Sequence, residues 1–233
     1  MNLANIVCVV NTITMNFYVP DIRIGIISSP ISDHFFSMRL SSGDPCSLTD
    51  LKGNTAAAVI LNADKKNRTI EYDINSIKTS DNARKGILYQ ALIDRSYQEK
   101  LIEVLPFSHF KKIVFVATDN ASPQQPNYDR LEGILIRSCC QCETAWKPHI
   151  QKEVVTIDKV LSKKDIIVMD SSFNDTQSES KQKKNACFVG PEGGWSDNEQ
   201  ELFKQFSASK IFYSGIVYPA WFAGLAFSMK TAT

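Results

Sequence analysis

The sequence has little histidine, almost no net charge and no long apolar run. It contains three histidines, and 26 Lys plus Arg balance 25 Asp plus Glu to leave a formal net charge of +1. A near-neutral chain has no global basic field, so its charge neither supports nor excludes a nucleic-acid partner. The first stretch, MNLANIVCVVNTIT, has no basic n-region and is shorter than the roughly 20 apolar residues of a membrane span. We therefore expect a cytoplasmic protein without membrane association, in which residues 1–14 form an extension.

Motifs for common cofactors and metals are also missing. There is no G-x-G-x-x-G, and no Lys-Ser/Thr follows the glycines near the C-terminus as in a phosphate-binding loop. Cys139 and Cys142 have CxxC spacing, but a structural zinc site needs four ligands, and His34, His109 and His149 are the only imidazoles. We interpret the cysteines as packing residues or free thiols and His109 as structural, and we expect no metal.

What the chain does contain is enough apolar sequence for one large core or two modest ones, since 43% of its 233 residues are hydrophobic. From Asn16 to about Ile77, short β-favouring runs alternate with turn signals, which is typical of an all-β module. After SDNARKG, helical and strand patterns alternate, and the apolar runs KIVFVAT and DIIVMD are typical of buried parallel strands. We predict an α+β protein of two domains, residues 1–85 and 86–233.

Two segments of the second half have distinct patterns. In YDRLEGILIRSCCQCETAW, helical spacing puts one set of apolar residues on a single face: Leu131, Ile134, Leu135, Cys139 and Cys142. The polar run SSFNDTQSESKQKKN is predicted to be a mobile loop. Its Lys181, Lys183 and Lys184 are either solvated or in contact with phosphate.

The stretch ACFVGPEGGWSDNEQELF, residues 186–203, is the strongest functional signal. It ends a strand, turns on three glycines and a proline, and begins a helix at a capping box of Ser196 and Glu199. The helix is expected to turn Leu202, Phe203 and Phe206 inward. Ligands bind at the carboxyl ends of strands in α/β sheets, and glycine lets them approach the backbone. A binding loop and a tight turn without a ligand both fit this pattern.

FVGPEGGWSDNE closely resembles the S-adenosylmethionine loop of the RsmE-type ribosomal RNA uridine methyltransferases of the SPOUT superfamily. DHFFSMRLSSGDPCSLTDLKGNTAAAVI resembles the N-terminal PUA-like barrel of that family, with matches at His34, Met38, Arg39, Leu40, Gly43 and Asp44. The middle of the chain resembles the family at Arg130, Ile134, Ile136, Gln141, Pro148 and Ile150. The resemblance covers most of the chain from about Met15 onward.

This resemblance implies a PUA-like β-barrel in residues 1–85 and a SPOUT domain with a C-terminal trefoil knot in residues 86–233. It also implies a homodimer that uses S-adenosylmethionine to methylate N3 of a uridine in 16S ribosomal RNA of the small subunit. The cofactor-binding residues that it implies are Met169, Gly190, Pro191, Glu192, Gly193, Gly194, Tyr213, Ile216 and Val217. Glu192 is expected to accept backbone N–H bonds within the loop.

Other residues have alternative interpretations. A basic group on and near a probable hairpin either contacts RNA phosphates or solubilises the hairpin: Arg39, Lys65, Lys66 and Arg68. Trp195 either packs on the core as a lid or stacks on a base. Pro219 and Trp221 are interpreted as core residues.

The chain departs from the family at charged positions. Thr118, Asp119, Asn120 and Ala121 replace Ser-Glu-Arg-Ser, and Thr144 replaces a second arginine. Further charged residues are replaced by Val104, Phe107, Tyr218 and Ala220, and Phe222 stands for an alanine. Removal of the uracil N3 proton benefits from a base or a cation, so no catalytic residue can be assigned.

Three hypotheses follow. The chain is the family enzyme, an RNA-binding or ribosome-assembly factor without activity, or a methyltransferase for another RNA. In the third case Asp119, Glu143 or the lysines of the 181–184 loop would supply the base or cation. We favour the enzyme, because a cofactor loop retained without chemistry is the less expected outcome.

Overall fold

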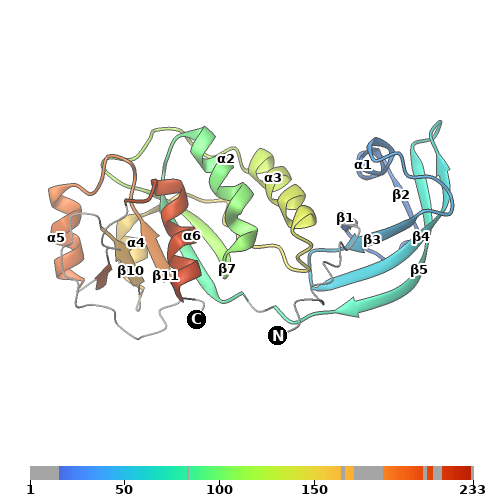
Figure 1. Cartoon of the computed structure of the whole chain (residues 1–233). Coiled ribbons are helices and arrows are strands. Elements are labelled where there is room, and N and C mark those ends of the chain that lie inside the picture. Colours follow the sequence, from blue (N-terminus) through green and yellow to red (C-terminus); the bar gives the residue numbers. More distant parts are fainter. Residues whose placement is uncertain are drawn as a thin grey trace, which may run out of the picture. The chain divides into compact units, whose positions relative to one another are not determined.

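The structure is a computed structural model and describes residues 16–82, 84–163, 166–170, 186–206, 209–211 and 217–231. It divides into two compact units (Figure 1). The first comprises Met1–Asp81 and Cys139–Trp146, and the second Asn82–Ser138 and Lys147–Thr233. Predictions for residues 1–14, for the loop with Lys181, Lys183 and Lys184, and for Tyr213 and Ile216 lie outside the described residues.

The first unit is built on a five-stranded sheet with the order β1-β3-β4-β5-β2. The strands are β1 (Asn16–Tyr18), β2 (Ile26–Ser28), β3 (Pro45–Thr49), β4 (Asn54–Asp64) and β5 (Thr69–Thr79). β1 runs parallel to β3, and the other pairs are antiparallel. The two longest strands, β4 and β5, form the hairpin that the sequence predicts, with residues 65–68 at its turn.

One prediction for this unit is wrong, because a helix, α1 (Ile31–Ser37), interrupts the expected all-β pattern. Phe35 on this helix is fully buried, and its ring stacks on Phe17 of β1 with centroids 4.1 Å apart. Ile31 and Phe35 are four residues apart and therefore lie on one helical face, which covers the sheet. The run is too short for its periodicity to stand out from the neighbouring strand signals.

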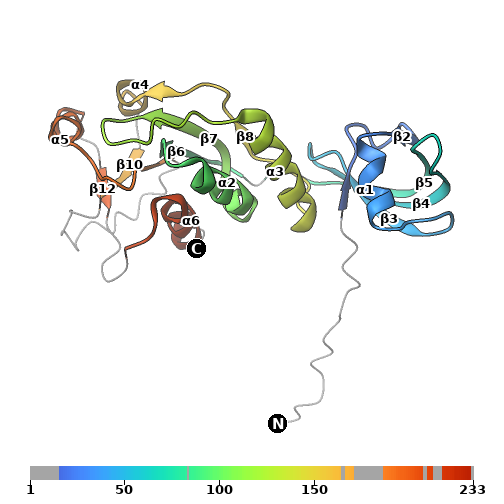
Figure 2. The ribbon, with the colours of Figure 1, turned by 90° about the horizontal axis from the view of Figure 1, so that it is seen from above.

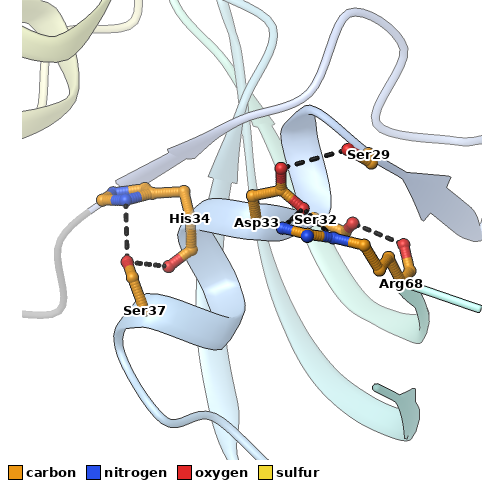
Figure 3. Close-up of polar contacts among 6 residues, drawn as sticks. All are labelled: Ser29, Ser32, Asp33, His34, Ser37 and Arg68. Atoms are coloured by element: carbon orange, nitrogen blue, oxygen red, sulfur yellow. Dashed lines mark hydrogen bonds and ion pairs between the residues drawn. The ribbon is translucent and has the colours of Figure 1, made fainter. Parts of the chain in front are cut away.

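Arg68 attaches the β4–β5 turn to α1 (Figure 3). Its guanidinium Nε donates to Asp33 Oδ1 at 2.8 Å, and its carbonyl accepts from the Ser32 hydroxyl at 2.5 Å. The hydroxyl of Ser29 donates to the other oxygen of Asp33 at 3.0 Å. The arginine charge is therefore partly neutralised within the unit.

The second unit contains a seven-stranded sheet in which every described pairing is parallel. Its order is β12-β10-β11-β6-β7-β8, and β9 pairs with β7. The strands are β6 (Gly86–Ala91), β7 (Phe110–Ala117), β8 (His149–Ile150), β9 (Val155–Thr156), β10 (Ile166–Met169), β11 (Ala186–Val189) and β12 (Ser209–Ile211). The predicted mixed fold with a parallel α/β domain is confirmed.

Helices lie on both faces of this sheet (Figure 2). They are α2 (Arg95–Val104), the 3-10 helix η1 (Leu105–Phe107), α3 (Tyr128–Gln141), α4 (Ile157–Leu161), α5 (Asp197–Gln205) and α6 (Ala220–Thr231). Val160 of α4 and Phe203 of α5 pack on one face with Tyr89 and Phe188. On the other face α6 approaches so closely that a Cβ on Gly224 would lie 2.6 Å from Leu88. Continuous apolar strands require this cover on both sides.

Several expected core positions are not fully buried. Phe206 caps the end of α5 and is 44% exposed, whereas Phe203 is 1% exposed. Pro219 is exposed just before α6, and Trp221 is half-buried. The predicted α3 stripe is buried at Leu131, Leu135 and Cys139, while Ile134 is half-buried and Cys142 lies beyond the helix end.

Candidate cofactor site at the glycine loop

The glycine loop, residues 190–194, follows the carboxyl end of β11 as predicted. The Gly194 N–H donates to the Pro191 carbonyl at 3.0 Å, which closes a turn. Gly194 has φ +71°, a conformation that disfavours side chains, and open space surrounds its missing Cβ. Pro191 is buried, whereas Glu192 and Gly193 are exposed.

Trp195 is held against this loop from several sides. Its indole N–H donates to the Met169 carbonyl at 3.0 Å, at the end of β10. Its ring packs edge-on against Phe188 and Phe203, with centroids 4.8 and 4.9 Å away. These contacts make the side chain a lid packed on the core.

A segment from β7 reaches the same loop. β7 and β11 flank β6, so the residues after their carboxyl ends meet at one edge of the sheet. The Asn120 amide donates to the carbonyls of Gly193 and Gly194 at 3.4 and 3.1 Å. Asp119 Oδ2 accepts from the Ser196 hydroxyl at 2.5 Å. Asn120 and Asp119 therefore hold the glycine loop and the start of the next helix in place.

Glu199 connects the loop, the helix and this segment. Its carboxylate accepts from the Ser196 N–H at 2.8 Å and from the Asp119 N–H at 2.9 Å, and its side chain is 2% exposed. The Ser196 hydroxyl accepts from the Glu199 N–H, which confirms the predicted capping box. Glu192, expected to hold the loop, is exposed and accepts no hydrogen bond from the described residues. Glu199 has that role because it is buried beside the orphan N–H groups of a helix start.

Among the described residues, two buried oxygens at this edge have no hydrogen-bond partner: Gln90 Oε1 and Thr118 Oγ1. Gln90 is fully buried at the end of β6, and its amide lies 3.5 Å from the Gly190 carbonyl. Unpaired buried acceptors are costly and rare, so these oxygens favour a ligand that brings a donor group to this edge. Sequence reasoning missed Gln90, although one amide in the apolar run ILYQAL was a visible signal.

Of the remaining predicted cofactor-binding residues, the structure describes Met169 and Val217. Met169 is half-buried at the end of β10, beside the end of β11. Val217 is 76% exposed and precedes α6. Asp170, after Met169, is a buried carboxylate that accepts from the Gln200 amide at 3.1 Å.

The predicted RNA-binding residues lie on the first unit. Arg39, Lys65, Lys66 and Arg68 are all exposed. Arg68 pairs with Asp33 at 2.6 Å, whereas Lys65 and Lys66 form no ion pair among the described residues. In the described structure the two lysines are thus the cations of the hairpin turn without an acidic partner.

The described residues contain buried cysteines but neither a metal-binding cluster nor a membrane-spanning helix. Cys139 and Cys140 are buried, and burial raises the pKa of the Cys140 thiol to about 11. Within the described ranges no group of three or more Cys, His, Asp or Glu side chains could hold a metal. No helix in those ranges is long and apolar enough to cross a membrane.

A comparison with protein-family models gives a match that includes the glycine loop. The family model for the RNA methyltransferase domain matches residues 80–212, more than half of the chain. No curated protein matches significantly.

Several solved structures have a similar fold. Ribosomal RNA small subunit methyltransferase E from Neisseria gonorrhoeae, bound to S-adenosyl methionine, is 17% identical with a TM-score of 0.80, over 93% of this chain and 96% of that chain. A Legionella pneumophila putative methyltransferase bound to the same cofactor is 18% identical with a TM-score of 0.81, over 94% and 96%. A Porphyromonas gingivalis probable rRNA-methyltransferase is 20% identical with a TM-score of 0.75, over 92% and 95%. With more than half of its length matched by the family model, the chain belongs to the RNA methyltransferase domain family.

Proposed function

We propose that this protein uses S-adenosylmethionine to methylate N3 of a uridine in 16S ribosomal RNA of the small subunit. The observation that carries the proposal is the glycine loop at the carboxyl end of β11 in a chain of the RNA methyltransferase family. The wider proposal is a cytoplasmic homodimer, with a PUA-like barrel before residue 86 and a C-terminal trefoil knot.

The residues at this edge fit S-adenosylmethionine. Its ammonium, amino and hydroxyl groups are donors, and Gln90 Oε1 and Thr118 Oγ1 are buried acceptors without a partner in the described part of the chain. The open side of Gly194 exposes backbone groups to a ligand. When bound, the cofactor supplies an electrophilic methyl group.

The chain itself has to position the uracil and receive its N3 proton. Asp119 is the carboxylate that contacts the glycine-loop segment on its exposed side, through the Ser196 hydroxyl. Its other oxygen, Oδ1, accepts no hydrogen bond within the described part of the chain. We therefore infer that Asp119 receives the proton, which a general base within hydrogen-bond reach can do.

A second candidate function has an observation in its favour. Asn120 stands where the family resemblance expects an arginine, and its amide donates to the glycine-loop carbonyls instead. Loss of one electrostatic stabiliser typically costs about 100- to 1000-fold in rate. An RNA-binding factor that retains the cofactor loop is therefore the alternative.

Methyl transfer from labelled S-adenosylmethionine to 30S subunits from cells that lack the family enzyme tests the proposal. We expect label at a uridine N3, and Asp119→Asn should lower the rate about 100-fold. Subunits already methylated by the family enzyme serve as the negative control. Absence of label on both substrates would contradict the proposed activity and favour the binding factor.

The hairpin cations give a separate prediction for RNA binding. Lys65→Gln with Lys66→Gln should weaken binding to 16S rRNA and lower the salt slope by about 2, since each lysine neutralises about one phosphate. Filter binding at several salt concentrations measures both effects. Arg68→Gln should instead lower the free energy of unfolding by about 0.2–1 kcal/mol, as for an exposed ion pair.

Asp33→Asn is the matched control, because it frees Arg68 without removing its charge. If Arg68 is structural, Asp33→Asn should reproduce the stability loss and leave RNA affinity unchanged. Tighter RNA binding by Asp33→Asn would mean that Arg68 contacts the RNA.

A further inference from the structure

The second unit has a depression of about 350 Å³ on the sheet face that α4 covers. Tyr89 of β6 and Lys112 and Val114 of β7 form its floor, because alternate residues of neighbouring strands face the same side. The segment between β8 and β9 and the end of α4 form its walls, through Gln151, Glu153, Val155, Lys159, Ser162 and Lys163. We call it the basic depression.

Its lining carries an excess of positive charge. Three lysines face one glutamate, although the chain as a whole is near neutral. The Lys159–Glu153 ion pair is long, at 3.6 Å, and its side chains are 65% and 63% exposed, so the interaction is weak. Lys112 and Lys163 have no acidic partner in the described ranges. The depression therefore favours an anion.

Neutral donors accompany the lysines. The Tyr89 side chain is 8% exposed, and burial raises the pKa of its phenol, so the O–H remains protonated near neutral pH. The Gln151 amide adds a further donor to the lining, whereas the Ser162 hydroxyl donates to the Lys159 carbonyl at 3.0 Å. Ammonium, phenol and amide donors around a small volume suit a phosphate group, because its non-bridging oxygens share the negative charge and can each accept more than one hydrogen bond.

The basic depression is separate from the glycine loop. Lys112 is near the amino end of β7, whereas the loop follows the carboxyl end of β11, and parallel strands put these ends at opposite edges. Aromatic contacts connect the two regions: Tyr89 lies 6.4 Å from Phe188, and Phe188 lies 4.8 Å from Trp195, between ring centroids. A long RNA could contact both regions along one side of the unit.

We propose that the basic depression binds a backbone phosphate of the RNA substrate, with Lys112 and Lys163 as its cationic ligands. This inference rests on the proposed function, because that function supplies the RNA. Phosphate contacts position an RNA without reading its sequence, so the depression would fix the register of the substrate on the second unit.

Binding of in vitro transcribed 16S rRNA to the full chain, measured across a salt series without cofactor, tests this proposal. Lys112→Gln with Lys163→Gln should lower affinity about 3- to 10-fold and make the salt slope less steep by about 1. Lys111→Gln with Lys85→Gln is the matched control, because it removes the same charge from exposed lysines of this unit outside the depression. Lys112→Arg with Lys163→Arg should retain wild-type binding.

The outcomes separate this inference from the proposed function. Equal affinity and slope for the glutamine and control variants would overturn the phosphate site, even if methyl transfer is intact. Binding of inorganic phosphate in the depression with unchanged RNA binding would also overturn it, since the ligand would then be a free anion. Dependence of RNA binding on Lys112 and Lys163 without methyl transfer would support the site and contradict the proposed activity.

Discussion

Gly190→Val is expected to destabilise the protein by about 1–3 kcal/mol and to weaken S-adenosylmethionine binding at least about tenfold. A Cβ at this position would lie 2.9 Å from Trp195 Cε2 and 3.0 Å from Cζ2. The indole cannot easily move, because its N–H donates to Met169 and its ring packs between Phe188 and Phe203. Valine must therefore displace the ring or shift the loop. Urea unfolding and calorimetric titration with the cofactor measure the two effects.

The matched control for this variant is Gly133→Ala. Gly133 lies inside α3, where a Cβ would meet only the Arg137 guanidinium, at 3.6 Å. Alanine is the better helix former, so the control should be unchanged or more stable by up to about 1 kcal/mol. A comparable loss in both variants would mean that glycine replacement harms the chain for another reason.

A double-mutant cycle with Trp195→Ala identifies the cause. If the collision with the indole causes the loss, the stability penalty of Gly190→Val should vanish when the ring is absent. A penalty of equal size with and without Trp195 would contradict this explanation. Cofactor affinity that stays low in the double variant would instead indicate that the ligand itself needs the space at Gly190.

Glu199→Gln is the second substitution with a large expected effect, a loss of about 2–3 kcal/mol in the free energy of unfolding. Each carboxylate oxygen accepts from one backbone N–H, that of Ser196 or that of Asp119. A glutamine offers only one acceptor, so its NH₂ would face one of these N–H groups inside a buried site. Chemical denaturation measures the loss, and amide hydrogen exchange should become faster at Ser196 and Asp119.

Glu201→Gln is the control on the same helix. Its carboxylate is 58% exposed and pairs with Lys204 at 3.1 Å, so the substitution should change stability by less than about 0.5 kcal/mol. If Glu199→Gln were as mild as this control, the connection between the loop and residue 119 would contribute little. Faster exchange along the whole of α5 would indicate general helix fraying instead.

The sequence predicted the second unit better than the first. Apolar runs identified β7 and β10 because strands buried on both faces need continuous hydrophobic sequence. The capping box located the start of α5 because its contacts are local, between Ser196 and Glu199. Local patterns predicted less in the first unit. There α1 is only seven residues long, too short for its helical periodicity to stand out from the neighbouring strands.

The site was predicted in part. The sequence of residues 186–199 predicted the turn and its position after a strand. It also offered a packed lid as one interpretation of Trp195, which the aromatic contacts favour. The partners of the loop were not visible. Asn120 contacts Gly194 across 74 positions of sequence, and Glu199 contacts Asp119 across 80. Contacts between residues so far apart in the sequence depend on the order of the strands in the sheet. No short sequence motif contains that order.

The sequence by itself determined the parallel α/β pattern, the glycine loop and the start of the following helix, since each depends on neighbouring residues. Only the tertiary structure decided that Glu199, rather than Glu192, holds the loop, and that Gly190 makes room for an indole. It alone brought Lys112 and Lys163 together around one depression. The physical reason is that burial and long-range contacts depend on which strands lie side by side, here β11, β6 and β7.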